Sequence, residues 1–112
     1  MGKLTYENSI RVDIDDRALA HLQLVIGTKL RRGESFFFSW REDASIGGGR
    51  TTVWMHPRCA LVYKYYGGRP PRLNSAWVEA LALVANSASG LYLVPEPAMA
   101  EHEVVSVDSL IG

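Results

Sequence analysis

TTVWMHPRCALVYKYYGGRPPRLNS, residues 51–75, is the stretch from which the fold is predicted. Apolar and polar residues alternate over Thr51–His56, which is typical of a half-buried strand. Pro57 ends this run because it has no N–H to donate to a ladder. A second strand is expected over Ala60–Tyr66, where two glycines follow. Residues 69–72 read Arg-Pro-Pro-Arg, a stiff basic spacer that leads the chain into a helix.

The part of the chain before this stretch predicts two strands and a helix. The strands are expected over Leu4–Tyr6 and Ile10–Ile14, with a polar turn between them. One of the two aspartates that follow caps a helix, which stops before Gly33. Apolar residues recur there at helical spacing and predict a buried stripe. His21 is expected on the opposite, polar face, where Leu24 is the one large apolar residue.

The middle of the chain predicts an antiparallel meander of three strands. Glu34–Glu42 contains three phenylalanines and a tryptophan, a strongly β-prone run. A glycine-rich connection leads from it to Thr51–His56, so we expect these two strands to form a hairpin. Ala60–Tyr66 then continues the meander through a short connection.

The remaining elements follow the basic spacer. Asn74 or Ser75 is expected to cap a helix over Ser75–Ser87, and Leu91–Val94 supplies a further strand. Val104–Val107 is left open between a last strand and disorder. The predicted fold is α+β, an antiparallel sheet with two helices mainly on one face, in the order ββαβββαβ.

Length and composition favour one small domain in a reducing compartment. The chain has 112 residues, of which 47% are hydrophobic, so residues 1–97 are expected to form one domain and residues 98–112 an acidic tail. No apolar run approaches the ~20 residues that span a bilayer, and the N-terminus lacks the apolar core of a signal peptide. Cys59 is the one cysteine, so no disulfide can form within the chain, which favours a cytoplasmic location. We expect Cys59 to be a small core residue.

The formal net charge of +0 hides an asymmetry along the chain. Met1–Arg72 holds all 12 lysines and arginines with seven acidic residues, a net charge of +5. From Leu73 onward there are five acidic residues and no lysine or arginine. This split indicates either a basic working surface with an acidic tail or a tail that neutralises the domain.

Aromatic rings interleaved with cations make one sheet face a candidate nucleic-acid surface. If Val53 and Met55 face the core, their neighbours along the meander face away from it. Such a face is suited to stacking bases and pairing phosphates. The alternative interpretation is that the rings pack against the tail or a second subunit, because large exposed apolar patches are usually covered. The predicted binding residues are Arg41, Arg50, Trp54, His56, Lys64, Tyr66, Arg69 and Arg72.

No motif for catalysis or metal binding accompanies this surface. The three histidines and Cys59 are scattered without ligand spacing, and G-x-S-x-G does not occur. GGGR followed by two threonines does not meet the phosphate-loop pattern and is interpreted as a hairpin tip. We therefore expect neither cofactor nor metal.

The second helix predicts self-association. After its cap only Glu79, Asn86 and Ser87 are clearly polar, so apolar residues surround most of its circumference. A helix of this kind is either deeply buried or shared with another subunit. Deep burial on every side is hard to arrange in a small domain, and we expect a homodimer.

Finally, the sequence carries a family resemblance that rests on four segments, MGKLTYENSIRVDIDDRALAHLQLVIGTKLRRGESFFFSW, RTTVWMHP, GGRPPRLN and LVPEP. They are similar to a family of short bacterial proteins that often carry the label ATP-dependent DNA ligase, and the similarity covers roughly residues 1–97. This resemblance implies nucleotidyl transfer through Lys64, with ATP and a divalent metal. The ligase motif is K-x-D-G, and here Tyr66 stands in the aspartate position. A non-catalytic module is the leading interpretation and ligase-like activity the alternative.

Overall fold

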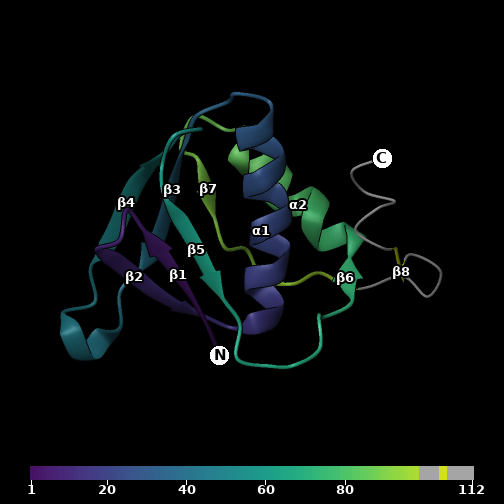
Figure 1. Cartoon of the computed structure of the whole chain (residues 1–112), viewed down its shortest axis with the longest axis horizontal. Coiled ribbons are helices and arrows are strands. Elements are labelled where there is room, and N and C mark those ends of the chain that lie inside the picture. The colour runs from purple at the N-terminus through teal and green to yellow at the C-terminus, as the bar shows by residue number, and fades with distance from the viewer. Residues whose placement is uncertain (99–103, 106–112) are drawn as a thin grey trace.

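Two three-stranded sheets and two helices make up most of the chain (Figure 1). The computed structural model describes residues 1–98 and 104–105. The predicted acidic tail therefore lies largely outside the described residues. The elements are β1 (Gly2–Tyr6), β2 (Ile10–Ile14), α1 (Asp16–Arg31), β3 (Phe36–Arg41), a 3-10 turn η1 (Ala44–Ile46), β4 (Arg50–Met55), β5 (Leu61–Lys64), β6 (Leu73–Asn74), α2 (Ser75–Ala85), β7 (Leu91–Tyr92) and β8 (Val104–Val105).

The α+β class is confirmed, and the predicted order of elements is roughly matched. The strand pairing differs from the predicted meander. One sheet has the order β2-β1-β5 and is antiparallel, whereas the other has the order β4-β3-β7 and includes a parallel β3–β7 pair. A separate two-stranded pair joins β6 to β8. In Figure 1 the two larger sheets lie to the left of α1, and the β6–β8 pair lies to its right.

The predicted pairing of the second and third meander strands is wrong, because β5 pairs with β1 instead of β4. Pro57 interrupts the ladder after β4, and the chain turns before β5 begins. Glu7 and Ala60 then exchange two hydrogen bonds: the Glu7 N–H donates to the Ala60 carbonyl at 2.8 Å, and the Ala60 N–H donates to the Glu7 carboxylate at 3.2 Å. These bonds align β5 with β1.

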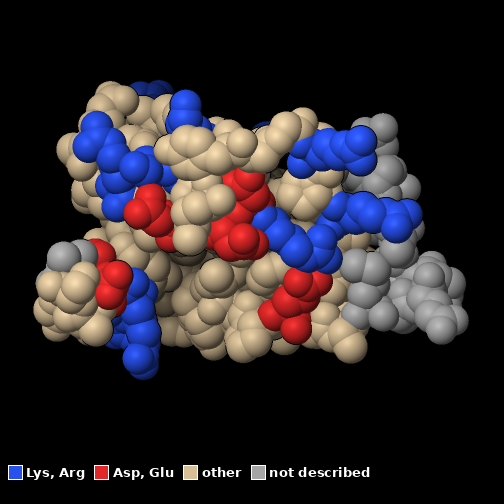
Figure 2. All heavy atoms as spheres, turned by 90° about the horizontal axis from the view of Figure 1, so that it is seen from below, with Lys and Arg blue, Asp and Glu red and all other residues tan. Residues whose placement is uncertain are grey.

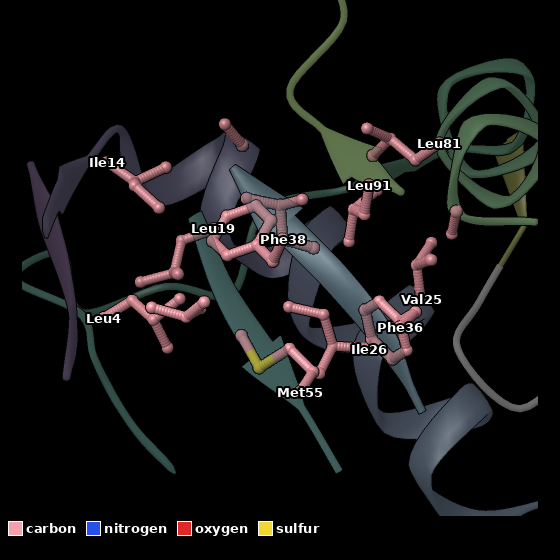
Figure 3. Packing of buried hydrophobic residues seen from close by; sticks show 14 of the residues in the cluster. Leu4, Ile14, Leu19, Val25, Ile26, Phe36, Phe38, Met55, Leu81 and Leu91 are labelled. Atoms are coloured by element: carbon pink, nitrogen blue, oxygen red, sulfur yellow. The ribbon is translucent and has the colours of Figure 1, made fainter. Parts of the chain in front are cut away.

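The core lies where both sheets meet α1. Figure 3 shows Leu4 of β1, Phe38 of β3 and Met55 of β4 pointing toward Leu19 and Ile26 of α1. Each of these side chains is at most 1% exposed. Full burial of a large apolar side chain contributes about 1.5–3 kcal/mol, so this cluster joins the two sheets into one packed unit.

Capping residues set the starts of both helices as the sequence predicted. The Asp15 carboxylate accepts from the N–H groups of Arg17 and Ala18 at the start of α1. Asn74 caps α2 by accepting from Ala76 N–H at 3.0 Å. The second helix ends at Ala85, two residues before the predicted end, where the Asn86 N–H closes its last turn.

The predicted polar face of α1 is wrong at His21, which is buried. Its Nε2 accepts from the Asn74 N–H at 2.8 Å, and its Nδ1 lies 2.7 Å from the Arg17 carbonyl. These partners make it a neutral imidazole that carries its proton on Nδ1. The ring also packs on Trp77, with centroids 4.5 Å apart. His21 therefore joins α1 to the start of α2.

A cluster of ionic hydrogen bonds fixes the segment that follows β7. Arg17 donates to both carboxylate oxygens of Glu96, at 2.9 and 2.7 Å. The Asn74 amide donates to Glu96 at 2.9 Å and to the Pro97 carbonyl at the same distance.

Over residues 1–98 and 104–105, no helix combines the length and hydrophobicity needed to cross a bilayer.

Candidate nucleic-acid interface

One face of the β4-β3-β7 sheet carries the aromatic and basic side chains that the sequence predicted there. Alternation along β3 buries Phe36 and Phe38 and leaves Phe37 exposed. Residues paired across strands share a face, so three rows of side chains form on the outer side of this sheet. We name it the aromatic–arginine face, and its residues are Phe37, Ser39, Arg41, Arg50, Thr52, Trp54 and Tyr92.

The first row is an aromatic pair. Phe37 lies opposite Trp54, with ring centroids 4.9 Å apart and the planes inclined by 66°. The rings are 45% and 48% exposed. The Trp54 carbonyl accepts from the Tyr6 hydroxyl at 2.6 Å, which ties β4 to the other sheet. The backbone at Trp54 is thus held both by its pairing with β3 and by the hydrogen bond from Tyr6.

The second and third rows are polar and basic. Ser39 and Thr52 are paired, and their hydroxyl oxygens lie 2.8 Å apart. Arg41 lies opposite Arg50, and both are exposed. At about 3.3 Å per residue, the arginine row is roughly 13 Å from the aromatic row. The order along the strands is therefore rings, hydroxyls and guanidinium groups.

Tyr92 adds a third ring that the sequence did not assign to this surface. It pairs with Ser39 across the parallel β3–β7 contact and is 46% exposed. β7 reaches this position because Gly90 approaches Phe37 closely: a Cβ at Gly90 would lie 2.5 Å from the Phe37 carbonyl oxygen. Gly90 also has a φ of +87°, which favours glycine.

The hairpin end beside the arginine row is held by short-range bonds. The Glu42 N–H donates to the Gly49 carbonyl at 2.7 Å, and the Thr51 hydroxyl donates to the Glu42 carboxylate. Asp43 accepts from the Ser45 N–H and caps η1. These contacts place the two arginines side by side at the base of the turn.

The structure places the other predicted binding residues outside strands β3, β4 and β7. Lys64 lies at the end of β5 in the other sheet, with its Nζ 5.6 Å from the centroid of the Tyr66 ring. Arg69 and Arg72 are exposed in the loop between β5 and β6. His56 follows β4, and its Nδ1 accepts from the Arg58 N–H at 3.3 Å. The predicted common surface is wrong in this respect, because β5 does not join the β3–β4 hairpin.

Two of the grooves on the described part of the chain lie near predicted binding residues. The first, of about 560 Å³, runs between α1 and the loop over residues 65–72 and includes Arg69 in its lining. The second, of about 960 Å³, lies beside the arginine row, and Asp13, Trp40 and Tyr92 contribute to its lining. Lys64 lines neither of them. Within residues 1–98 and 104–105, no three or more His, Cys, Asp and Glu side chains gather in a group that could hold a metal ion.

Basic residues are not gathered into a single patch on the face drawn in Figure 2. Lysine and arginine side chains alternate there with aspartate and glutamate. An ion pair also joins two neighbouring strands, β1 and β2, where the charged groups of Lys3 and Asp13 lie 3.7 Å apart. Charge alone therefore does not mark one extended polyanion track on that side.

Comparisons with known proteins identify a family. No curated protein and no solved structure matches the chain. A family model, described as a domain of unknown function (DUF7882), matches residues 1–96. This match covers nearly the same residues as the resemblance described above, whereas the ligase label stays a prediction. Since the match spans most of the sequence, the chain belongs to the DUF7882 family.

Proposed function

We propose that the chain is a small, non-catalytic cytoplasmic module whose aromatic–arginine face binds single-stranded nucleic acid. The observation that carries this proposal is the order of side chains on one sheet face: exposed rings at one end, paired hydroxyls in the middle and two arginines at the other end. Single-stranded nucleic acids present the matching groups, bases that stack and phosphates that accept.

The aromatic residues supply most of the expected affinity. Stacking of a base on an exposed ring contributes about 1–3 kcal/mol and depends little on the base. Trp54, Phe37 and Tyr92 each retain about half of their surface for such contact. A duplex hides its base faces, so this arrangement favours single strands.

Arg41 and Arg50 supply the phosphate contacts in this proposal. A guanidinium group presents a planar fork that matches phosphate oxygens. The Ser39 and Thr52 hydroxyls, which bond to each other at 2.8 Å, add acceptors and donors between rings and arginines. With two arginines on the face, we expect binding that is weakly selective for sequence and moderately sensitive to salt.

Fluorescence anisotropy with a labelled oligothymidine and a duplex of equal length tests this function. Trp54→Ala should weaken oligothymidine binding about tenfold or more. Arg41→Gln and Arg50→Gln should each flatten the dependence of affinity on salt, by about 0.7 in the logarithmic slope per lost contact. Arg69→Gln is the matched control, because Arg69 lies in the loop between β5 and β6 and outside the aromatic–arginine face. This variant should bind as the parent does.

Two results would overturn the proposal. One is no binding of either oligonucleotide at low salt. The other is equal loss of affinity in Arg69→Gln and Arg41→Gln, since this would place the phosphates elsewhere or reduce the effect to net charge.

A second copy of the chain is the other partner that we propose. Leu83 of α2 is 74% exposed, although Trp77 and Leu81 of the same helix are buried. An exposed leucine on a helix that is otherwise apolar favours an isologous contact between two α2 helices. Such a dimer leaves the aromatic–arginine face available twice.

A further inference from the structure

The groove between α1 and the β5–β6 loop is built by residues that the proposed nucleic-acid interface does not use. Ala20, Leu24, Thr28 and Arg31 of α1 form one wall, at spacings of three or four residues. At 1.5 Å per residue they extend over roughly 16 Å of the helix. Pro70 and Pro71 belong to the facing wall.

Side chains of α1 hold both ends of the facing loop. The Asp16 carboxylate accepts from the N–H groups of Tyr66 and Gly67, the latter at 2.8 Å. The Tyr65 hydroxyl donates to Gln23 at 2.5 Å. At the far end, Arg17 donates to the Arg72 carbonyl at 2.7 Å.

These contacts hold the loop in a defined position beside the helix. Its ends are tied, and the two consecutive prolines between them have fixed φ angles and stiffen the span. The groove of about 560 Å³ is consequently preformed and falls within the range of small-molecule sites.

Gly27 keeps the floor of the groove open. It lies in the interior of α1, where glycine is the least favourable residue after proline. It lines the groove, and a Cβ built on it meets nothing within 4 Å. No packing contact therefore requires glycine at this position, whereas a larger side chain would occupy the groove.

The charged residues in the lining have one sign among the residues that the structure describes. Arg31 and Arg69 are present there, and none of these lining residues is an aspartate or a glutamate. Burial raises the pKa of Tyr65 to about 12, so its phenol stays neutral. The remaining lining is largely apolar or aromatic, with Leu24, Tyr63 and the two prolines. An occupant with an apolar ring system and one anionic group satisfies both parts of this lining.

We propose that this groove is a binding site for a small organic anion with an apolar ring system, distinct from the aromatic–arginine face. The rings lie along α1 over Gly27, against Leu24 and Tyr63. The anionic group pairs with Arg31 or Arg69. The ligand rings lie between the walls of the groove and fill the space above Gly27.

Two fluorescent probes test the site on the full chain. 8-Anilinonaphthalene-1-sulfonate has fused rings and one sulfonate, and N-phenyl-1-naphthylamine has the same rings without the charge. We expect both to bind, the sulfonate more tightly. Arg31→Gln and Arg69→Gln should reduce affinity for the sulfonate, about tenfold for the arginine that pairs with it, and leave affinity for the neutral probe unchanged.

Gly27→Leu fills the groove and should abolish binding of both probes. Its melting temperature should equal or exceed that of the parent, because leucine favours the helix and has room for its Cβ. Arg41→Gln and Trp54→Ala are matched controls on the aromatic–arginine face and should bind both probes as the parent does. Both variants should impair oligothymidine binding while leaving probe binding unchanged, and this difference separates a failure of this site from a failure of the proposed function.

Three results would overturn the site: no probe binding by the parent, parental affinity in Gly27→Leu, or loss of probe binding in Trp54→Ala. Amide chemical shifts of the parent give a measurement that does not depend on folding of a variant. The sulfonate should shift the amides of Gly27, Arg31 and Gly67 most, and shifts confined to β3 and β4 would contradict the proposal.

Discussion

The Glu96 carboxylate accepts hydrogen bonds from Arg17 and Asn74, and these bonds lower its pKa from 4.5 to about 2. A carboxylate with a lowered pKa in the folded state stabilises the protein above pH 4.5, and this contribution is lost as the pH falls from 4.5 toward 2. The Arg17 and Glu96 side chains are 32% and 31% exposed, so solvent screening limits the effect to about 1 kcal/mol.

We predict that Glu96→Gln melts at a lower temperature than the parent at pH 7 and at nearly the same temperature at pH 2. Thermal unfolding followed by circular dichroism over this range measures the difference. Glu79→Gln, at an exposed position of α2, is the control and should follow the parent. A Glu96→Gln curve parallel to the parent curve at every pH would contradict the assignment.

His21 titrates in a separate window. Burial is the main cause that lowers its pKa below 6.5, because the charged ring would lose its water and its Nε2 already accepts from Asn74. Below pH 6.5 the His21 ring is protonated in the unfolded chain more readily than in the folded chain, so stability falls as the pH drops below 6.5.

His21→Phe should remove this dependence while keeping the ring contact with Trp77. It leaves the Asn74 N–H without its acceptor, so we expect a loss of about 1–3 kcal/mol at pH 7. Urea unfolding at pH 7 and pH 5.5 is the measurement. The parent should lose stability between these two values, and the variant should not.

At the scale of elements, the β3–β7 contact depends on one residue without a side chain. A Cβ at Gly90 would lie 2.5 Å from the Phe37 carbonyl oxygen and 2.8 Å from the Phe37 Cβ, and backbone atoms cannot yield as a flexible side chain can. Gly90→Ala should therefore separate β7 from β3 and cost about 2 kcal/mol or more, since its φ is also strained.

Gly27→Ala is the matched comparison for this substitution. Its Cβ meets nothing within 4 Å and it lies within α1, so alanine should stabilise the protein by up to about 1 kcal/mol. Denaturant unfolding followed by tryptophan fluorescence compares the two variants. Equal changes in the free energy of unfolding would show that the close contact of Gly90 with Phe37 does not determine the effect of the substitution.

Elements could be predicted from the sequence where their signals are local. Asp15 and Asn74 each accept from N–H groups two or three residues later, so both helix starts follow from short segments. The partner of β5 had no such signal. Tyr63 pairs with Leu4, and the bonds that align them join residues more than fifty positions apart.

The candidate site divides in the same way. The Phe37–Trp54 and Arg41–Arg50 pairs belong to one hairpin, and alternation along its strands was enough to predict their common face. Tyr92 joins them through the parallel β3–β7 pair, which the sequence did not reveal. The groove beside α1 depends on Asp16 and Arg17 contacting residues 66–72, and no local pattern indicates such contacts.

For the whole molecule, the exposed side of α2 is the surface that we propose for self-association. We predict that the parent sediments as a dimer at micromolar concentration and that Leu83→Glu sediments as a monomer. Leu83 is 74% exposed, so the substitution should change the free energy of unfolding by less than about 0.5 kcal/mol. A parent of strictly monomeric mass would exclude self-association through α2.

The central place of β1 in its sheet has a consequence for synthesis on the ribosome. β2 follows β1 within a few residues and can pair with it as soon as both leave the exit tunnel. The other side of β1 has no partner until Leu61–Lys64 has been made, and β3 waits in the same way for Leu91–Tyr92. Each unpaired edge offers free N–H and C=O groups to neighbouring chains. The nascent chain therefore carries these unpaired edges until β5 and β7 have left the exit tunnel, and slower translation before that point would prolong its exposure to aggregation.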